Sequence, residues 1–563
     1  MKIKLKLISF IIFNSLAFSG TTGKLVGKII DKDTGNPLIG CNVIIEDTYM
    51  GTSSNELGEY ILLNIPPGNY NVRFEMIGYK RVINDGVTII SDKTITLNGE
   101  LVSSVIEGEE VIVLAEKKLI QFDVTQSEAI ISSEELDGMP VTEVEEVLRL
   151  QGGVTVDSDG GIHMRGGRTS EVSYMVDGVP MSDVYSGGIG VQIENDNIQE
   201  LQVISGTFNA EYGRALTGVV NMVTKDGGNK FEGSIHTYAG DYQSGDNIYN
   251  NLEKFDIQDD YSFSANLSGP IIKDKVTFYS SGRVNQSNGW LNGLQTFTIY
   301  GDTIFSDLND NLYLDGIETQ KEPYYKGLNW YDSWSSQNKI TFNVLKNTIF
   351  KINTIINSRK GQDYNHFLQF LENAQITNYN EGKFFGFNLT HSLSATSFIE
   401  AKISENNFNY ESYLFEDPLD RRYITPDSLF LARQENRIPE HIIEQYGDQV
   451  QYYPAYSLFR AGVDNRRFKR KTKTRNVKLD YTSQINRFNQ IKIGLDFSEH
   501  SLMLDNYSIL DSTLTDQVYT PIIPEKGSFT RTSYTFKPTE FAIYAQDKIE
   551  YKDMIINFGL RYE

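Results

Sequence analysis

The sequence predicts a mostly β protein that folds in three parts: a small β-sandwich, a mixed α/β domain and a partial antiparallel transmembrane β-barrel. Two observations predict this fold class. Turn residues separate short β-prone runs near the N-terminus, and from residue 229 onward, runs of about ten residues alternate between the two faces of a strand. Hydrophobic residues make up 39% of the chain, which excludes a bundle of transmembrane helices but not a barrel, because only alternate barrel residues face lipid.

Length, charge and cysteine content exclude further classes of protein. The 563 residues exceed one typical domain of about 100 to 200 residues, so several domains are expected. The 52 Lys and Arg against 74 Asp and Glu give a net charge of −22, and we therefore expect no nucleic-acid partner. The single cysteine, Cys41, permits neither an internal disulfide nor a cysteine-based metal site.

Residues 1–20 have the pattern of a secretory signal peptide. Lys2, Lys4 and Lys6 precede an apolar run, and Ala17-Phe18-Ser19 gives a cleavage site of small residues. The apolar run is shorter than the roughly 20 residues that cross a bilayer as a helix. The sequence therefore predicts an exported chain.

Residues 21–105 are expected to form a small antiparallel sandwich. Short β-prone runs alternate here with turn sequences such as 33–37 and 66–68. The expected strands are 25–30, 41–45, 60–63, 69–76, 87–90 and 94–97.

The same region resembles the carboxypeptidase regulatory-like domain. The resemblance is carried by Gly-Asn-Pro-Leu-Ile-Gly-Cys-Asn-Val at 35–43, Gly51-Thr52, Gly-Glu-Tyr at 58–60 and Ile-Pro-Pro-Gly-Asn-Tyr at 65–70. It implies a non-catalytic, seven-stranded module.

Two patterns resemble metal sites but are incomplete. His441 and Glu444 have the spacing of two zinc ligands on one helical face, yet the six histidines supply no third ligand. An acidic stretch matches an EF-hand loop but has Leu312 where the loop needs glycine. That stretch consists of Asp307, Asn309, Asn311, Asp315 and Glu318. We therefore expect no metal, no cofactor and no enzymatic activity.

A charged linker at 106–118 surrounds one short β-prone run, which includes Glu110, Val111, Ile112 and Val113. Such a segment can add as a strand to the open sheet edge of another protein, because main-chain hydrogen bonds supply the affinity. It can equally be the last strand of the sandwich. The segment alone favours neither interpretation.

Residues 119–228 predict a mixed α/β domain. A helix is expected at 141–150, with Val144, Val147 and Leu148 on one face. Asp177-Gly178 is a tight-hairpin signal between two apolar runs.

Several motifs follow in a fixed order: Gly-Gly-Val at 152–154, Arg165-Gly166-Gly167, the run around Asp177-Gly178, residues 198–206 and residues 210–225. Glycine at 166–167 and 187–188 permits positive φ and close strand approach. Together the motifs resemble the plug domain of TonB-dependent outer-membrane receptors. The resemblance implies that residues 110–113 lie at the position of the TonB box, the segment that binds the TonB complex of the inner membrane.

Residues 229–563 predict a partial transmembrane barrel of about eleven strands. Short turns alternate with long polar connections, an asymmetry typical of outer-membrane barrels. The expected strands are 231–238, 261–268, 275–284, 337–344, 349–357, 383–391, 396–405, 474–483, 488–497, 538–548 and 554–562.

The resemblance implies a complete barrel of 22 strands, so the sequence is expected to be an N-terminal fragment of a longer receptor. About eleven strands would leave two unpaired edges in lipid, where each unsatisfied backbone group costs several kcal/mol.

The functional hypothesis is energy-coupled import across the cell outer membrane of a Gram-negative type, with outer-membrane lipid and an unknown extracellular substrate as further partners. The alternative is a non-transporting surface or adhesion protein that uses the barrel as an anchor. The linker lacks the fuller signature of glycan importers, which argues against a surface lipoprotein lid.

Overall fold

The computed structural model describes residues 22–48, 50–104, 127–139, 143–157, 161–206, 208–246, 248–299, 324–345, 347–423, 462–511, 521–551 and 554–563, the single residues Val141 and Phe459, and the backbone of 110–114. The predicted signal peptide, the acidic stretch at 307–318 and the His441/Glu444 pair lie outside the described residues. No helix within the described ranges is long and apolar enough to cross a membrane.

The N-terminal part is a sandwich of two sheets around one apolar core that includes Leu25, Val43 and Phe74. The first sheet contains β1 (Gly23–Asp31), β4 (Glu59–Ile65), β7 (Thr94–Thr96) and β8 (Gly99–Leu101). The second has the order β3 (Gly51–Ser53), β2 (Asn42–Ile45), β5 (Gly68–Glu75), β6 (Arg81–Ile89) and β9 (Glu110–Leu114).

The expectation of a purely antiparallel sandwich is wrong. Strand β1 pairs in parallel with both β7 and β8, and β6 pairs in parallel with β9. The physical reason is that these partners are joined by long crossovers between the two sheets, whereas turn signals reveal only the hairpins.

The second domain is built on a five-stranded sheet with the order β10, β15, β16, β13, β14. Their bounds are β10 (Ser127–Ser132), β13 (Val172–Val176), β14 (Val179–Pro180), β15 (Ile198–Ser205) and β16 (Gly218–Thr224). A hairpin of β11 (Val154–Val156) and β12 (Ile162–Met164) and the helices α2 (Ser133–Asp137) and α3 (Val144–Arg149) complete the domain. Every residue of β16 is buried, as expected for a strand covered on both faces.

The helix expected at 141–150 is present but begins at Val144, after Glu143, which forms a reciprocal capping box with Glu146. The five-residue helix α2 was not predicted, because it is too short to show helical periodicity.

The third part is a twelve-stranded antiparallel sheet, called here the wall. All eleven expected strands are present in chain order. Their bounds are β17 (Glu232–Gly240), β18 (Asp260–Ile272), β19 (Val276–Ser287), β22 (Tyr331–Leu345), β23 (Thr348–Gly361), β24 (Thr377–Ser394), β25 (Ser397–Tyr413), β26 (Arg466–Gln484), β27 (Asn489–Ser508), β31 (Thr539–Tyr551) and β32 (Met554–Tyr562).

The twelfth strand, β30 (Arg531–Phe536), pairs with the outer half of β27, while β31 pairs with its inner half. Pro538, which has no backbone N–H to donate, lies between β30 and β31. The two strands therefore occupy one position in the wall.

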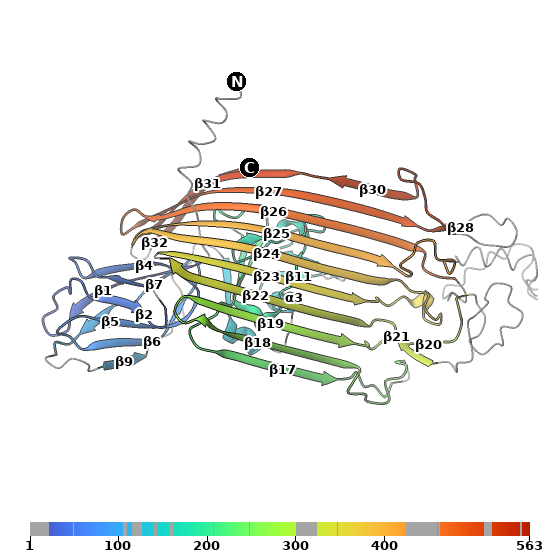
Figure 1. Cartoon of the computed structure of the whole chain (residues 1–563), viewed down its shortest axis with the longest axis horizontal. Helices are drawn as coiled ribbons and strands as arrows, with labels where there is room; N and C mark the ends of the chain where they lie inside the picture. The colour runs from blue at the N-terminus through green and yellow to red at the C-terminus, as the bar shows by residue number, and fades with distance from the viewer. Residues whose placement is uncertain are drawn as a thin grey trace, which may run out of the picture.

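Figure 1 shows the arrangement of the three parts. The sandwich lies at the end of the wall where the connections are short, and the long connections lie at the opposite end. Among the described strands the wall is an open sheet with β17 and β32 at its edges. The long connections contain the short pairs β20 (Asn292–Gln295) with β21 (Tyr324–Gly327), and β28 (Leu510–Asp511) with β29 (Pro521–Ile522). They also share a small apolar core that includes Leu368, Tyr423 and Ile509.

Candidate functional site: the plug and its contacts

The predicted hairpin at Asp177-Gly178 is present. Strands β13 and β14 pair through Val176 and Val179, so only two residues connect them. Asp177 has a φ of 48° and Gly178 a φ of 75°. Positive φ at both central residues is the requirement of a type I′ turn, and it explains why the Asp-Gly sequence marks this hairpin.

Asp177 also fixes the end of β16. Its carboxylate accepts hydrogen bonds from the backbone N–H of Thr224 at 2.9 Å and from the Thr224 hydroxyl at 2.8 Å. From the wall, Lys339 lies 3.3 Å from the same carboxylate, and Lys402 donates to the Asp177 carbonyl at 2.9 Å. The hairpin is therefore a point at which the second domain is attached to the wall.

Asp226, two residues after Thr224, is the other half of this attachment. Lys339 and Lys351 of the wall lie 3.0 Å and 2.5 Å from its carboxylate. Burial raises the pKa of Asp226, but the two ammonium groups lower it further, so the net shift is downward. The carboxylate is therefore ionised at neutral pH and paired with both lysines.

The Arg165-Gly166-Gly167 motif forms a turn directly after β12. Arg165 and Gly166 have φ values of 49° and 78°. A Cβ on Gly167 would lie 2.1 Å from the methyl carbon of Thr217, so a larger residue here would require Thr217 to move. The motif therefore has a packing role in the second domain.

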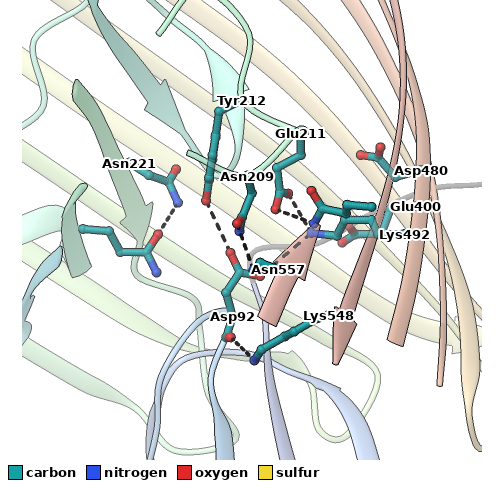
Figure 2. A network of polar contacts seen from close by, with 12 residues as sticks. Asp92, Asn209, Glu211, Tyr212, Asn221, Glu400, Asp480, Lys492, Lys548 and Asn557 are labelled. Carbon is teal, nitrogen blue, oxygen red and sulfur yellow. Dashed lines mark hydrogen bonds and ion pairs between the residues drawn. The ribbon is translucent and has the colours of Figure 1, made fainter. Parts of the chain in front are cut away.

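Figure 2 shows a second network, where all three parts of the chain meet. Lys492 of the wall lies 2.6 Å from Glu211 of the second domain and 3.9 Å from Asp92 of the sandwich. Tyr212 donates to the Asp92 carboxylate at 3.3 Å, and Lys548 donates to the Asp92 carbonyl at 3.1 Å. One wall lysine thus contacts carboxylates from two different domains.

The two carboxylates differ in their electrostatic environment. Burial raises the pKa of Glu211, yet Lys492 and Lys478 outweigh it and bring the pKa down to about 2. Burial raises the pKa of Asp92, and the more distant Lys492 compensates only in part. Glu211 is thus the stronger ionic partner of the wall.

The sandwich makes further polar contacts with both other domains. Lys24 pairs with Glu550 near the end of β31, and Lys93 lies 2.5 Å from Glu128 of β10. These contacts join the sandwich to the end of the wall where the connections are short.

A chain of buried polar groups crosses the second domain from the sandwich to the hairpin. The Ser91 N–H donates to Glu200 at 3.4 Å, and Gln202 donates to the same carboxylate at 2.8 Å. Asn221 then donates to Gln202 at 2.8 Å and accepts from the Gly178 N–H at 3.2 Å. The sandwich and the hairpin are thereby connected through one strand pair, β15 and β16.

The contact between the second domain and the wall is largely polar and contains several buried ion pairs. Besides the pairs above, Arg283 lies 2.8 Å from Glu194, and Arg470 lies 2.9 Å from Asp183. From the wall, the buried core cluster of the second domain includes Ile355 and Phe384. A cavity of about 50 Å³ at the junction has room for water and is lined by charged side chains such as Lys339 and Lys351 together with apolar ones such as Ile349 and Phe387. Such an interface can separate and be rehydrated more readily than an apolar one.

Only some of the predicted site residues lie at the contact between the second domain and the wall. Asp177 and Gly178 lie at the attachment to the wall, whereas Arg165, Gly166 and Gly167 form a turn within the second domain. Residues 110–113 lie in β9, which pairs in parallel with β6 at the edge of the sandwich, from Arg81–Glu110 to Asp85–Leu114.

Sequence reasoning missed the carboxylates Asp92, Glu211 and Asp226 and their wall lysines. The available signal was a lysine at an inward-facing strand position, as in Lys339 and Lys492, because such a charge needs a buried partner.

Two family models match the chain. A CarboxypepD_reg-like domain matches residues 25–113, and a TonB-dependent Receptor Plug Domain matches residues 121–220. The first match includes the segment at 110–113.

Curated relatives of the chain are described as TonB-dependent transporters or receptors. The TonB-dependent transporter Oar of Myxococcus xanthus is 25% identical over 350 residues, which is 56% of this chain and 32% of that protein. The TonB-dependent receptor P3 of Formosa agariphila is 26% identical over 216 residues, covering 36% of this chain and 20% of that one. The chain thus matches no more than about a third of the length of these relatives.

Solved structures share the fold. The outer membrane transporter YddB from Escherichia coli covers 77% of this chain and 56% of its own, with a TM-score of 0.52 and 13% identity. The ferripyoverdine receptor of the outer membrane of Pseudomonas aeruginosa covers 79% of this chain and 52% of its own, with a TM-score of 0.52 and 14% identity. The chain therefore combines a CarboxypepD_reg-like domain with a TonB-dependent receptor plug domain, and the curated relatives that it resembles are TonB-dependent transporters and receptors.

Proposed function

We propose that this protein imports a substrate across the outer membrane by energy-coupled displacement of the plug. The TonB complex would bind residues 110–113 and pull on the chain that leads into β10. The plug would then leave the wall and open a passage.

The observation that carries the proposal is the ionic character of the contact between plug and wall. Plug carboxylates such as Asp226, Glu211 and Glu194 face wall cations, so the plug is held by groups that water can solvate after separation. An anchor that never moves gains more from apolar packing, because buried ion pairs contribute little net stability.

The position of β9 supports a coupling role for residues 110–113. Strand β9 lies at the end of its sheet, with β6 as its hydrogen-bonded neighbour among the described strands. An edge strand can accept a further strand from another protein, or leave its own sheet to do so. Strand β9 is the last strand of the sandwich and precedes the plug in the chain, so force applied to it would act on both.

The sandwich would restrain the plug until force is applied. Its Asp92 and Lys93 contact the plug at Tyr212 and Glu128, and its Lys24 contacts the wall at Glu550. Displacement of the plug therefore requires these contacts to break.

Disulfide capture in cells tests this proposal. The natural Cys41 is fully buried, so an introduced cysteine is the reactive one. Ile112→Cys should form a disulfide with a cysteine placed in the strand-pairing region of TonB. A protonophore should reduce the yield, and Val111→Pro in the same chain should abolish it because proline removes a backbone donor.

The matched control is a cysteine at Glu56, an exposed position of the sandwich away from β9. Capture at Glu56→Cys equal to that at Ile112→Cys, or no capture at either position, would contradict the proposal. Capture that is unaffected by the protonophore and by Val111→Pro would favour a non-transporting anchor.

A further inference from the structure

The plug loop between β15 and β16 is attached to the wall at two points. The first is the pair of Glu211 with Lys492 of β27 (Figure 2). At the second, the Arg214 guanidinium pairs with Glu540 of β31 and bonds His500 of β27. Arg214 has a φ of 57°, a left-handed conformation that is uncommon for residues other than glycine. The side-chain contacts therefore hold this loop in a conformation that its backbone does not favour.

His500 can bind Arg214 only as a neutral imidazole. Its Nε2 atom lies 2.8 Å from a guanidinium nitrogen of Arg214, and its Nδ1 atom lies 2.9 Å from the hydroxyl of Thr474 on β26. A guanidinium only donates hydrogen bonds, so Nε2 is an acceptor that carries no proton. The single ring proton is then on Nδ1 and is donated to Thr474. A second proton, on Nε2, would break the bond to Arg214.

The charged groups that face His500 offer little compensation for a second proton. Within the described ranges they are Arg214 of the plug, Glu540 of β31 and Asp496 of β27 itself, and β26 presents uncharged side chains beside it. Arg561 lies 3.5 Å from Asp496 and already serves as its counter-ion. Glu540 lies 3.6 Å from His500, but it is the ion-pair partner of Arg214. Protonation of His500 would therefore place two cations beside one carboxylate.

The members of this contact differ in their exposure to solvent. His500 is 1% exposed, so a charge on its imidazole is costly unless a partner compensates it. The side chains of Arg214 and Glu540 are 30% and 50% exposed. The contact is thus buried at the imidazole but reaches solvent through its two other members.

We propose that Arg214 and His500 form a pH-sensitive latch, which holds the plug against the wall at neutral pH and opens in acid. An imidazole in water takes up a proton below about pH 6.5. The latched state excludes this proton and the released state binds it, so the stability of the seated plug decreases as the pH falls below this value. The use of the latch rests on the plug displacement proposed above, because acid would lower the force that displacement requires.

The other attachment of the same loop does not respond to this pH range. Burial raises the pKa of Glu211, but Lys492 and Lys478 outweigh it and bring the pKa down to about 2. The Glu211 carboxylate is therefore ionised at pH 5 as well as at pH 8. Acid weakens the attachment of the loop without abolishing it.

Guanidinium-induced release of the plug from the full chain in micelles, followed by limited proteolysis at pH 5 and pH 8, tests the latch. His500→Gln keeps both hydrogen bonds, since an amide can accept from Arg214 and donate to Thr474, but it does not titrate. At pH 8 the wild type and this variant should release the plug alike. At pH 5 the equilibrium constant for release should be about tenfold larger for the wild type, the factor expected for one hydrogen bond to a charged group. Other titrating groups, such as Glu200, affect both chains equally.

A double-mutant cycle of Arg214→Met and His500→Leu gives a second measurement, which does not depend on the folding of His500→Gln. The two substitutions should be coupled by about tenfold at pH 8 and should act independently at pH 5, where the bond between the two residues is absent. The matched control is His236→Gln, at an exposed histidine of β17, which should keep the wild-type pH profile.

The same pH profile for the wild type and His500→Gln would overturn the latch, and so would a coupling that is equal at pH 5 and pH 8. This measurement needs neither TonB nor a proton-motive force. Its failure would therefore leave the import proposal intact, which the disulfide capture described above tests separately.

Discussion

The Lys492 ammonium of the wall lies 2.6 Å from the Glu211 carboxylate of the plug, and both side chains are more than nine-tenths buried. Removal of one partner from such a pair is costly, because the other charge remains buried without compensation. The loss of stability when this contact is removed therefore measures how firmly the wall holds the plug.

Lys492→Met should destabilise the seated plug by about 3 kcal/mol. Guanidinium-induced release of the plug, followed by limited proteolysis of the full chain in micelles, measures the effect. Lys492→Met/Glu211→Gln should recover much of the loss, since it removes both charges. The control Lys383→Met breaks an exposed pair and should cost less than about 1 kcal/mol. Equal costs for the two lysines would show that the buried pair does not hold the plug.

Gly178→Ala should lower the stability of the plug by about 1 to 2 kcal/mol, because Gly178 has a φ of 75°, which L-residues adopt only with strain. The comparison is Gly152→Ala, where a new Cβ would meet nothing within 4 Å and φ lies outside the strained region. Thermal unfolding of both variants checks the prediction. The same unfolding midpoint for both would refute the proposed turn geometry.

The stability of the junction between sandwich and plug should depend on pH through Glu200. Burial raises the pKa of Glu200 from its ordinary value of 4.5 to about 7. Between these pH values the folded chain binds more protons than the unfolded chain, so stability decreases as the pH rises through this window.

Glu200→Gln removes the titrating group and should flatten this dependence. Thermal unfolding of wild type and variant at pH 5 and pH 8 measures the difference, with Glu56→Gln as an exposed control. A wild type and a Glu200→Gln variant with the same pH profile would show that Glu200 does not titrate in this range.

The wall illustrates what alternation in a sequence can predict. Every expected strand is present, but β25 and β26 extend beyond the predicted ranges at the outer end, to Tyr413 and from Arg466. Above the apolar band both faces of a strand are mostly polar, as in residues 466–475 of β26, so the alternation of apolar and polar residues disappears there. The hydrogen-bond ladder continues without it.

The site was predictable only where local backbone geometry determines the residue. Asp177 and Gly178 have a sequence signature because a type I′ turn restricts which residues fit. Glu211 and Lys492 are 281 positions apart, and their pairing depends on how the plug is placed against the wall. No local pattern contains that information, and the same applies to Asp92, whose domain lies at the opposite end of the chain.

Energy-dependent exposure of a buried plug residue tests plug displacement most directly. Val191 is 1% exposed and lies against Gly382 of β24. In cells, Val191→Cys should react with an impermeant thiol reagent only while the proton-motive force is present, and not in a Val111→Pro background. The parent chain, whose Cys41 is buried, gives the background. Labelling at the same rate with and without a protonophore would contradict energy-coupled displacement of the plug.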